Sequence, residues 1–369
     1  MKIERIELRE LPLRLKFPFR TSFGVEQDLR VFLVSVTADG VSGIAECTAG
    51  ETPGYSYETV DTAWGVIRDY AAPQLLGKSF DTAAELLHEL RYIRGHNMAI
   101  AALEMAFWDA KAKALNIPLW SLLGGVKRPI PVGISLGIQD SVEETVALAK
   151  QAVADGYNRV KLKIQPGWDV QPVQGVREAL PDISLTVDAN SAYRLTDAPQ
   201  LRRLDEYHLD YIEQPLAYDD LVDHAELQAQ LDTAICLDES IHSADDARKG
   251  LAIGSGRVIN IKVARMRGFR EALAAHDIAQ SFGAPVWCGG MLETGIGRAA
   301  NLHLSSLPNF RLPGDTSSSS RYWDQDIINE PLEAVSGTQT IPEHGPGIGV
   351  SLNTEFVERL TTRVENLTK

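Results

Sequence analysis

Charged residues recur along the middle of this chain at a nearly constant spacing, and each follows a short apolar run. Lys163, Asp188, Glu213 and Asp238 lie 25 residues apart, and Lys262 comes 24 residues after Asp238. A β-strand, a crossover helix and two short loops take about this many residues, and such units assemble into parallel sheets or barrels. If the runs are consecutive strands, all five side chains stand at strand C-terminal ends, the rim where barrel enzymes carry their chemistry.

The same rhythm of strands and helices begins near residue 130 and continues past residue 300. No glycine-rich GxGxxG motif follows the first strand-like run, which favours a TIM-like barrel over an open dinucleotide-binding sheet. We therefore predict an α/β fold built on such a barrel. The expected strands are 131–137, 159–164, 184–188, 209–213, 234–238, 258–263, 284–288 and 309–312.

The N-terminal part of the chain has a different pattern. Residues 1–50 alternate apolar and polar side chains with period two, which predicts an antiparallel β-meander. Residues 16–25 contain the breakers Pro18 and Gly24 and are expected to connect the first two strands. From 56 to 125, apolar residues recur at i, i+3 and i+4, which predicts helices.

Capping residues and composition suggest where these elements and segments end. Asp81 and Asn97 are predicted N-caps of two N-terminal helices, and Gly283 is a predicted residue C′ of a barrel helix. We expect three segments, namely an N-terminal α+β domain at 1–125, the barrel catalytic domain at 126–322 and a C-terminal segment at 323–369 that returns to the first domain.

Charge and cysteine content restrict the partners of the protein. The formal net charge is −14, which disfavours nucleic acid and anionic membrane surfaces. No apolar run has the length of a membrane span, and the first residues lack the apolar core of a signal peptide. Cys47, Cys236 and Cys288 have no CxxC spacing and indicate reduced, buried thiols. We expect a cytoplasmic protein that acts on a small molecule, and a homo-oligomer, as is common for such barrels.

Asp188, Glu213 and Asp238 have the chemistry of a hard-cation site. Mg²⁺ takes carboxylate oxygens and keeps its remaining positions for water and substrate. Three converging carboxylates without a counter-charge would repel one another, so a divalent cation explains them best. An acid at a strand end can instead cap the next helix, which accounts for one aspartate but not for three acids in one register. We therefore predict a Mg²⁺ site, in which Mn²⁺ or Co²⁺ may substitute.

Three lysines flank this predicted metal site. Lys161 and Lys163 are two residues apart on one strand and point to the same face, where a buried pair needs acidic neighbours. Lys163 ends the second barrel strand and Lys262 the sixth, so their amines should face each other across the barrel mouth. A metal-bound carboxylate substrate would then present its α-carbon to one lysine on each side. That arrangement suits removal of an α-proton, stabilisation of an enediolate and return of a proton to either face.

These residues stand in motifs that resemble the enolase superfamily, in its muconate-lactonising branch, over essentially the whole chain. The motifs are Lys161-Leu162-Lys163, Asp188-Ala189-Asn190, Glu213-Gln214-Pro215, Asp238-Glu239-Ser240 and Lys262-Val263. The resemblance implies a modified (β/α)7β barrel with an α+β capping domain formed by the N-terminal region and the C-terminal tail. It also implies that Lys163 and Lys262 are catalytic and that the three acids bind the metal.

Longer runs resemble the group of o-succinylbenzoate synthases and N-acylamino acid (N-succinylamino acid) racemases. These runs are 163–169, 287–293 and 313–317. Arg265 matches an arginine typical of racemase-capable members, and Phe19 and Phe23 match a mobile loop that closes over the substrate. The resemblance implies substrate-binding roles for Phe19, Phe23, Ser135, Lys161, Asn190, Met291 and Leu292, and auxiliary roles for Glu239, Arg265 and Asp315.

The expected activity is metal-dependent α-proton abstraction from a carboxylate substrate. The resemblance implies racemisation of N-acyl or N-succinyl amino acids, dehydration to o-succinylbenzoate in menaquinone synthesis, or both. A dipeptide epimerase would carry an acid where Ser317 stands, and a muconate-type cycloisomerase has no specific cue. From a different class, Lys163 could be the Schiff-base lysine of a barrel aldolase, but that reading leaves the three acids unexplained. A non-catalytic binding role would make all five rim residues incidental.

Overall fold

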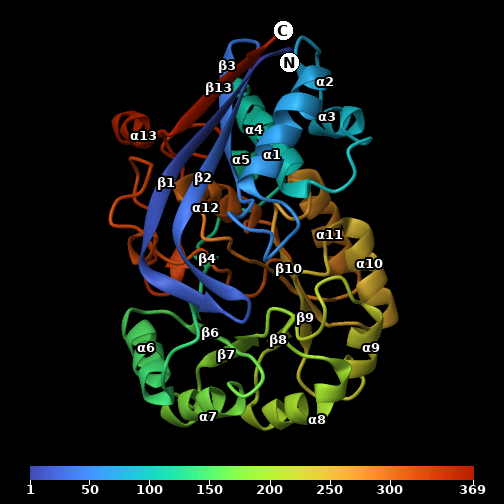
Figure 1. The fold of residues 1–369 in the computed structure, drawn as a ribbon, viewed down its shortest axis with the longest axis vertical. Helices are drawn as coiled ribbons and strands as arrows, with labels where there is room; N and C mark the ends of the chain where they lie inside the picture. The colour runs from blue at the N-terminus through green and yellow to red at the C-terminus, as the bar shows by residue number, and fades with distance from the viewer.

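The computed structural model describes residues 1–369, and its N-terminal part is a four-stranded antiparallel sheet. The strand order is β13 (Arg363–Thr368), β1 (Ile3–Thr21), β2 (Gly24–Ala38) and β3 (Val41–Cys47). The predicted meander is confirmed as β1, β2 and β3. The end of the chain returns to this sheet, because β13 pairs with β1, and both termini lie together at the top of Figure 1.

The prediction for residues 16–25 was wrong, because they continue the hairpin instead of forming a loop. Strand β1 runs on to Thr21, and only Ser22 and Phe23 make the turn before β2. The pairing register shifts between Arg14 and Phe19, and Pro18, which has no N–H to donate, falls within this irregularity. The long hairpin thereby reaches from the sheet down to the barrel (Figure 1).

Helices follow this sheet in the chain, and the longest of them, α4, packs against β2 and β3. They are α1 (Val60–Val66), a π-helical turn (Ile67–Ala71), α2 (Ala72–Leu75), α3 (Ala83–Glu89), α4 (Asn97–Ala114) and α5 (Leu119–Leu122). Two predicted caps were wrong by one residue. Thr82 caps α3 by accepting from Glu85 N, and His96 precedes α4 in a left-handed conformation. A distant carboxylate, that of Glu58, accepts from the first amides of α4, an arrangement that local sequence does not reveal.

The second sheet has seven parallel strands in sequential order. They are β5 (Ile134–Leu136), β6 (Arg159–Lys163), β7 (Ser184–Asp188), β8 (Ile212–Glu213), β9 (Ile235–Leu237), β10 (Val258–Ile261) and β11 (Val286–Cys288). The predicted eighth strand, 309–312, is not a regular strand. Phe310 forms a parallel bridge with Val286, and Gly314 forms one with Val132, so this segment bridges the two edges of the curved sheet.

Helices connect successive strands and cover the outside of this sheet, as Figure 1 shows for α6 to α11. They are α6 (Val142–Ala154), α7 (Val170–Ala179), α8 (Ala198–Leu201), α9 (Val222–Gln228), α10 (Ala244–Ile253), α11 (Phe269–Ser281) and α12 (Gly295–Leu304). Gly283 follows α11 with a φ of 75° and confirms the predicted helix end. The remaining elements are β4 (Ile130–Pro131), β12 (Thr338–Gln339), α13 (Thr354–Leu360) and 3₁₀ turns at Leu195–Asp197, Arg202–Tyr207 and Ser319–Arg321. No helix is long and apolar enough to cross a membrane.

The N-terminal sheet and the barrel share one apolar core, and Glu104 is a polar link within it. Glu104 lies on α4, is fully buried, and accepts from the backbone amides of Phe269 and Arg270 at the start of α11, both at 2.9 Å. Its carboxylate also accepts from the indole of Trp108 at 2.7 Å. Gly268, with a φ of 117°, leaves room for this contact, since a Cβ there would stand 2.4 Å from Glu104 Oε2. One carboxylate thus caps the helix that follows β10.

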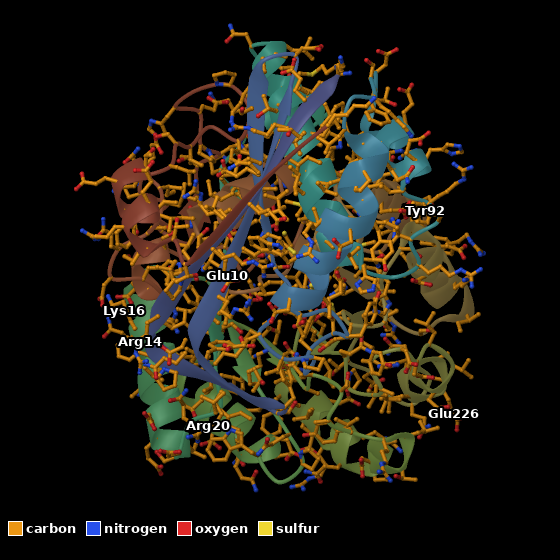
Figure 2. The ribbon with its side chains drawn as sticks, turned by 45° about the horizontal axis from the view of Figure 1, so that its top comes forward. Glu10, Arg14, Lys16, Arg20, Tyr92 and Glu226 are labelled. Carbon is orange, nitrogen blue, oxygen red and sulfur yellow. The ribbon has the colours of Figure 1, made fainter.

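Removing this carboxylate is expected to destabilise the fold. In Glu104→Ala, two backbone amides and an indole N–H lose their acceptor, so the free energy of unfolding should fall by about 2–4 kcal/mol. Urea unfolding followed by circular dichroism measures the change. Glu226→Ala is the matched control, because Glu226 lies on the outer surface of α9 (Figure 2) and its loss should change stability by less than about 0.5 kcal/mol. Equal effects of the two substitutions would contradict the capping role.

Candidate active site

The five rim residues stand at the C-terminal ends of consecutive strands of the parallel sheet, and Asp238 and Lys262 directly follow β9 and β10. Lys163 on β6 is in register with Asp188 on β7, which is in register with Glu213 on β8. Glu213 is opposite Cys236 on β9, so Asp238 lies two residues further toward the same end and, by the alternation of a strand, on the same face. The strands bearing Lys163 and Lys262 are therefore separated by the three strands that bear the acids.

Direct ion pairs link the lysines and the acids. Lys161 Nζ lies 2.8 Å from Glu213 Oε2 and 3.6 Å from Asp188 Oδ2. Lys163 Nζ lies 2.5 Å from Asp188 Oδ2, and Lys262 Nζ lies 2.9 Å from Asp238 Oδ2. Lysine ammonium groups thus lie against oxygens of all three carboxylates. In this arrangement, no three acidic, histidine or cysteine side chains stand close enough together to enclose a cation.

The charges of these carboxylates act on one another. Burial raises the pKa of Glu213 to about 8, and the negative charges of Asp188 and Asp238 raise it as well. The positive charge of Lys161 acts to lower the same pKa. Burial also acts to raise the pKa of Asp238, but the positive charges of Arg265 and Lys262 outweigh it and the pKa is lowered. The acids are therefore near enough for the charge of each to affect the pKa of its neighbours.

The donor set fits a hard divalent cation. Besides the three carboxylates, two buried oxygens nearby have no hydrogen-bond partner, Oε2 of Glu239 and Oδ1 of Asn260. All of these are oxygen ligands, as Mg²⁺ and similar ions prefer. The assignment of Asp188, Glu213 and Asp238 as the ligands of such an ion stays a prediction from the sequence.

The neighbours of Lys262 set the charge state of its amine and leave space for its side chain. Burial alone would lower the pKa of Lys262, but the adjacent charge of Asp238 raises it well above the usual value. Gly289, at the end of β11, leaves the necessary space. A Cβ at Gly289 would lie 2.7 Å from Lys262 Cε and 2.4 Å from Asn260 Oδ1.

Tyr55 is a member of this site that sequence reasoning missed. Its hydroxyl accepts from Lys262 Nζ at 2.9 Å and from Arg265 Nη1 at 3.1 Å, and its ring centroid lies 4.5 Å from the Lys262 ammonium. Burial and the negative charge of Asp238 raise the pKa of Tyr55 to about 12. Tyr55 comes from the N-terminal part of the chain, far from any barrel motif, so no local signal points to it.

The auxiliary residues of the prediction are all drawn into the same network. Arg265 pairs with Asp238 and donates from Nε to Ile241 O at 2.8 Å. Asp315 accepts from Lys161 at 2.8 Å and from the buried Arg159 at 2.8 Å. Arg265 therefore contacts Lys262 only indirectly, through Asp238 and Tyr55.

Asn190 connects Lys163 with a further acid. Its Oδ1 accepts from Lys163 Nζ at 2.8 Å, and its Nδ2 donates to Glu239 Oε1 at 2.9 Å. Asn260 was missed, although it lies two residues before Lys262 on the same strand face and donates from Nδ2 to Glu213 at 2.7 Å. The period of a strand could have identified it.

A small chamber of about 60 Å³ lies between the two lysines. It is lined by Phe19, Ser135, Lys161, Lys163, Asp188, Lys262, Gly290, Leu292, Glu293, Arg298, Asp315 and Tyr322. The Lys163 ammonium lies 5.9 Å from the Phe19 ring centroid, and the buried Ser135 hydroxyl has no partner. The predicted catalytic lysines and Asp188 thus share one cavity with four predicted substrate-binding residues, Phe19, Ser135, Lys161 and Leu292.

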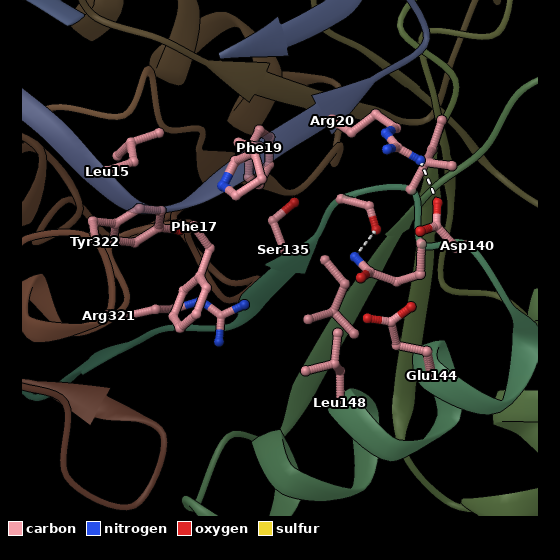
Figure 3. Close-up of a pocket in the computed structure, with 15 residues that line it drawn as sticks. Leu15, Phe17, Phe19, Arg20, Ser135, Asp140, Glu144, Leu148, Arg321 and Tyr322 are labelled. Atoms are coloured by element: carbon pink, nitrogen blue, oxygen red, sulfur yellow. Dashed lines mark hydrogen bonds and ion pairs between the residues drawn. The ribbon is translucent and has the colours of Figure 1, made fainter. Parts of the chain in front are cut away.

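Two larger cavities adjoin this chamber. One, of about 440 Å³, lies between the hairpin and α6 and shares Phe19, Ser135 and Tyr322 with the chamber (Figure 3). The other, of about 360 Å³, lies beside β2 and shares Leu292, with Met291 and Tyr55 also in its wall. Phe23 lines none of the three cavities; it is 43% exposed, and its ring centroid lies 6.3 Å from that of Tyr55.

Comparison with known proteins gives relatives over nearly the whole chain. A family model described as Mandelate racemase / muconate lactonizing enzyme, N-terminal domain, matches residues 4–124, and one described as Enolase C-terminal domain-like matches 144–356. An N-succinylamino acid racemase of Thermus thermophilus is 52% identical over 361 residues, with 98% of each chain covered. An o-succinylbenzoate synthase of Geobacillus kaustophilus is 51% identical over 362 residues, which cover 98% of this chain and 96% of that enzyme.

The fold agrees as well. The crystal structure of an enolase superfamily member from Listeria innocua has a TM-score of 0.96 at 39% identity, covering 100% of this chain and 99% of that one. The two family models, the sequence relatives and the Listeria innocua structure all indicate the same superfamily. The chain belongs to the divalent-metal-dependent enolase superfamily, in the branch of mandelate racemase and muconate-lactonising enzymes.

Proposed function

We propose that this enzyme removes the α-proton of a carboxylate substrate and racemises N-succinyl and other N-acyl amino acids. We further propose that the same site dehydrates a cyclohexadiene carboxylate to o-succinylbenzoate in menaquinone synthesis. The observation that carries the proposal is the pair of amines, Lys163 and Lys262, in one chamber from opposite sides of the acid-bearing strands. The names of the two relatives at 51% and 52% identity support both reactions.

In the proposed reactions, the site residues have catalytic, metal-binding and substrate-binding roles. Lys163 takes the α-proton from one face of the substrate and Lys262 takes it from the other, so that either lysine can return a proton with inversion. Asp188, Glu213 and Asp238 would hold a divalent cation, for which we propose Mg²⁺ and which would supply positive charge beside the substrate carboxylate. In the dehydration, Lys163 serves as base and acid on one face, and the ammonium of Lys262 stabilises the opposite face. Ser135, Lys161 and Asn190 orient the substrate around the lysines.

We also propose a cellular location, an oligomeric state and a domain division for the enzyme. All three cysteines are free and buried, which supports a reducing cytoplasmic environment. We also propose that the chain forms a homo-oligomer. The segments 1–125, 126–322 and 323–369 are proposed as N-terminal domain, barrel and returning tail.

The test is a pair of assays on the purified protein with Mg²⁺. In D₂O, each enantiomer of an N-succinylamino acid should incorporate deuterium at the α-carbon and yield both enantiomers. The dehydration substrate should yield o-succinylbenzoate under the same conditions. Exchange of one enantiomer without racemisation would restrict the function to one-base chemistry, and inactivity on both substrates would remove the proposal.

A further inference from the structure

Arg298, on α12, is a buried cation of the reaction chamber that has no acidic partner. Its side chain is 2% exposed, yet it lines the chamber. The three lysines of the chamber differ, because Lys161, Lys163 and Lys262 all form ion pairs. A buried charge without a counter-charge is costly, which makes an absent anion the natural partner of Arg298.

The guanidinium of Arg298 is held in place by neutral groups. Nε donates to Glu293 O at 2.9 Å and Nη1 donates to Ser317 O at 2.6 Å. The guanidinium carbon lies 4.4 Å from the ring centroid of Tyr322. These contacts orient the fork and leave Nη2 without an acceptor in the protein.

Glu293 does not neutralise this arginine, although its backbone carbonyl accepts from Nε. The Glu293 carboxylate is engaged elsewhere, with Met291 N at 2.9 Å and with Asn301 Nδ2 at 2.9 Å. It forms no ion pair with Arg298. The free donor of Arg298 is therefore available for an anion inside the chamber.

We propose that Arg298 binds a second carboxylate of the substrate, the one at the far end of its acyl group. This inference rests on the proposed function and assigns to Arg298 the preference for a charged acyl chain over an uncharged one. A guanidinium is suited to the planar carboxylate and remains charged at all working pH values. Both proposed reactions involve a succinyl chain, so one arginine serves both.

The position of Tyr322 indicates where the acyl chain lies. Tyr322 stacks on Arg298 and lines both the chamber and the 440 Å³ cavity, so Arg298 stands on the side of the chamber that opens toward this cavity. Figure 3 shows Tyr322 beside Phe17 at one side of that cavity. The acyl chain enters on this side, and the amino-acid side chain is left to the cavity bordered by Met291 and Leu292.

The experiment compares two substrates that differ only in the terminal charge. One is an N-succinylamino acid, and the other is its N-succinamyl analogue, in which an amide of similar shape replaces the terminal carboxylate. Wild-type enzyme should prefer the charged substrate. In Arg298→Gln, kcat/KM for the charged substrate should fall by about 10- to 100-fold, while that for the amide changes by less than about threefold. Arg298→Lys, which keeps the charge, should recover part of the preference.

The kinetic results distinguish carboxylate binding by Arg298 from a purely structural role of this residue. An equal loss on both substrates would reduce Arg298 to a structural role and overturn the inference. Loss of the charge preference in Arg321→Gln instead would place the carboxylate at the cavity edge, also against the inference. If Arg298→Gln does not fold, the wild-type preference and Arg298→Lys still decide. A wild-type enzyme that racemises both substrates equally refutes this inference alone, whereas one that racemises neither refutes the proposed function.

Discussion

Replacing Lys163 by alanine is expected to abolish both proposed reactions, with a fall in kcat of at least about 10³-fold. The Lys163 amine lies 2.5 Å from Asp188 Oδ2 and 2.8 Å from Asn190 Oδ1, whereas the Lys161 amine lies 3.6 Å from the same Asp188 oxygen. Lys161, two residues earlier, is held by Glu213 and Asp315 and points deeper into the barrel. The dehydration and the racemisation should be lost together.

Lys262→Ala should give a different pattern. Racemisation should fall by a similar factor, while deuterium exchange should persist with the enantiomer whose proton faces Lys163. Lys163→Ala should show the reverse exchange preference. Nuclear magnetic resonance of the α-proton in D₂O measures exchange for each enantiomer separately. Lys249→Ala is the control, because Lys249 is half exposed on α10 and pairs only with Asp245 and Asp246, outside the chamber.

The two-base assignment depends on this asymmetry. Full racemase activity in Lys262→Ala would end it, and loss of exchange with both enantiomers in each variant would show that the lysines act as one unit. Circular dichroism and cation binding of the variants distinguish these outcomes from misfolding.

Glu213→Gln is expected to weaken divalent-cation binding by more than about 100-fold, since even partners outside the ligand shell commonly contribute 10- to 100-fold. Glu213 is fully buried at the centre of the acid-bearing strands, between Asp188 and Asp238. The substitution removes one negative charge and leaves Lys161 without one of its acidic partners. Racemase activity should be lost with the cation.

Calorimetric titration with Mg²⁺, in parallel with the exchange assay, measures both effects. A chelator should inactivate the wild-type enzyme, and added Mg²⁺ should restore it, with Mn²⁺ and Co²⁺ tested as substitutes. Asp245→Asn on the surface of α10 is the matched control and should bind Mg²⁺ as the wild type does. Unchanged Mg²⁺ affinity in Glu213→Gln would falsify the assignment of the metal ligands.

Sequence periodicity predicted the barrel well because a parallel strand buried on both faces has a short apolar run and its charged end marks the rim. It predicted the hairpin and the helix caps poorly. Pairing through an irregular register carried β1 past Pro18, and Glu58 and Glu104 cap helices from distant positions in the chain. Such contacts depend on how elements pack, and no local pattern encodes them.

For the site, the repeat identified Lys163, Asp188 and Lys262, which line one chamber, and two further acids, Glu213 and Asp238, which pair with lysines of that chamber. The catalytic and metal-binding roles of these residues stay predictions. Two of the site residues that the repeat missed, Tyr55 and Arg298, have no local sequence signal. Tyr55 comes from the N-terminal part of the chain. Arg298 reads as an ordinary helix arginine until its burial and its lack of an acid are seen.

Local patterns in the chain were enough to predict the order of the strands, the five charged residues at their ends and the class of chemistry that such a set supports. They were enough because strand spacing and side-chain alternation are local properties of the chain. The packing of distant segments sets which charges are paired, which arginine is left unpaired, and which cavities the hairpin borders near the lysines. Those features depend on distances between segments far apart in the sequence, which are set when the N-terminal sheet packs on the barrel.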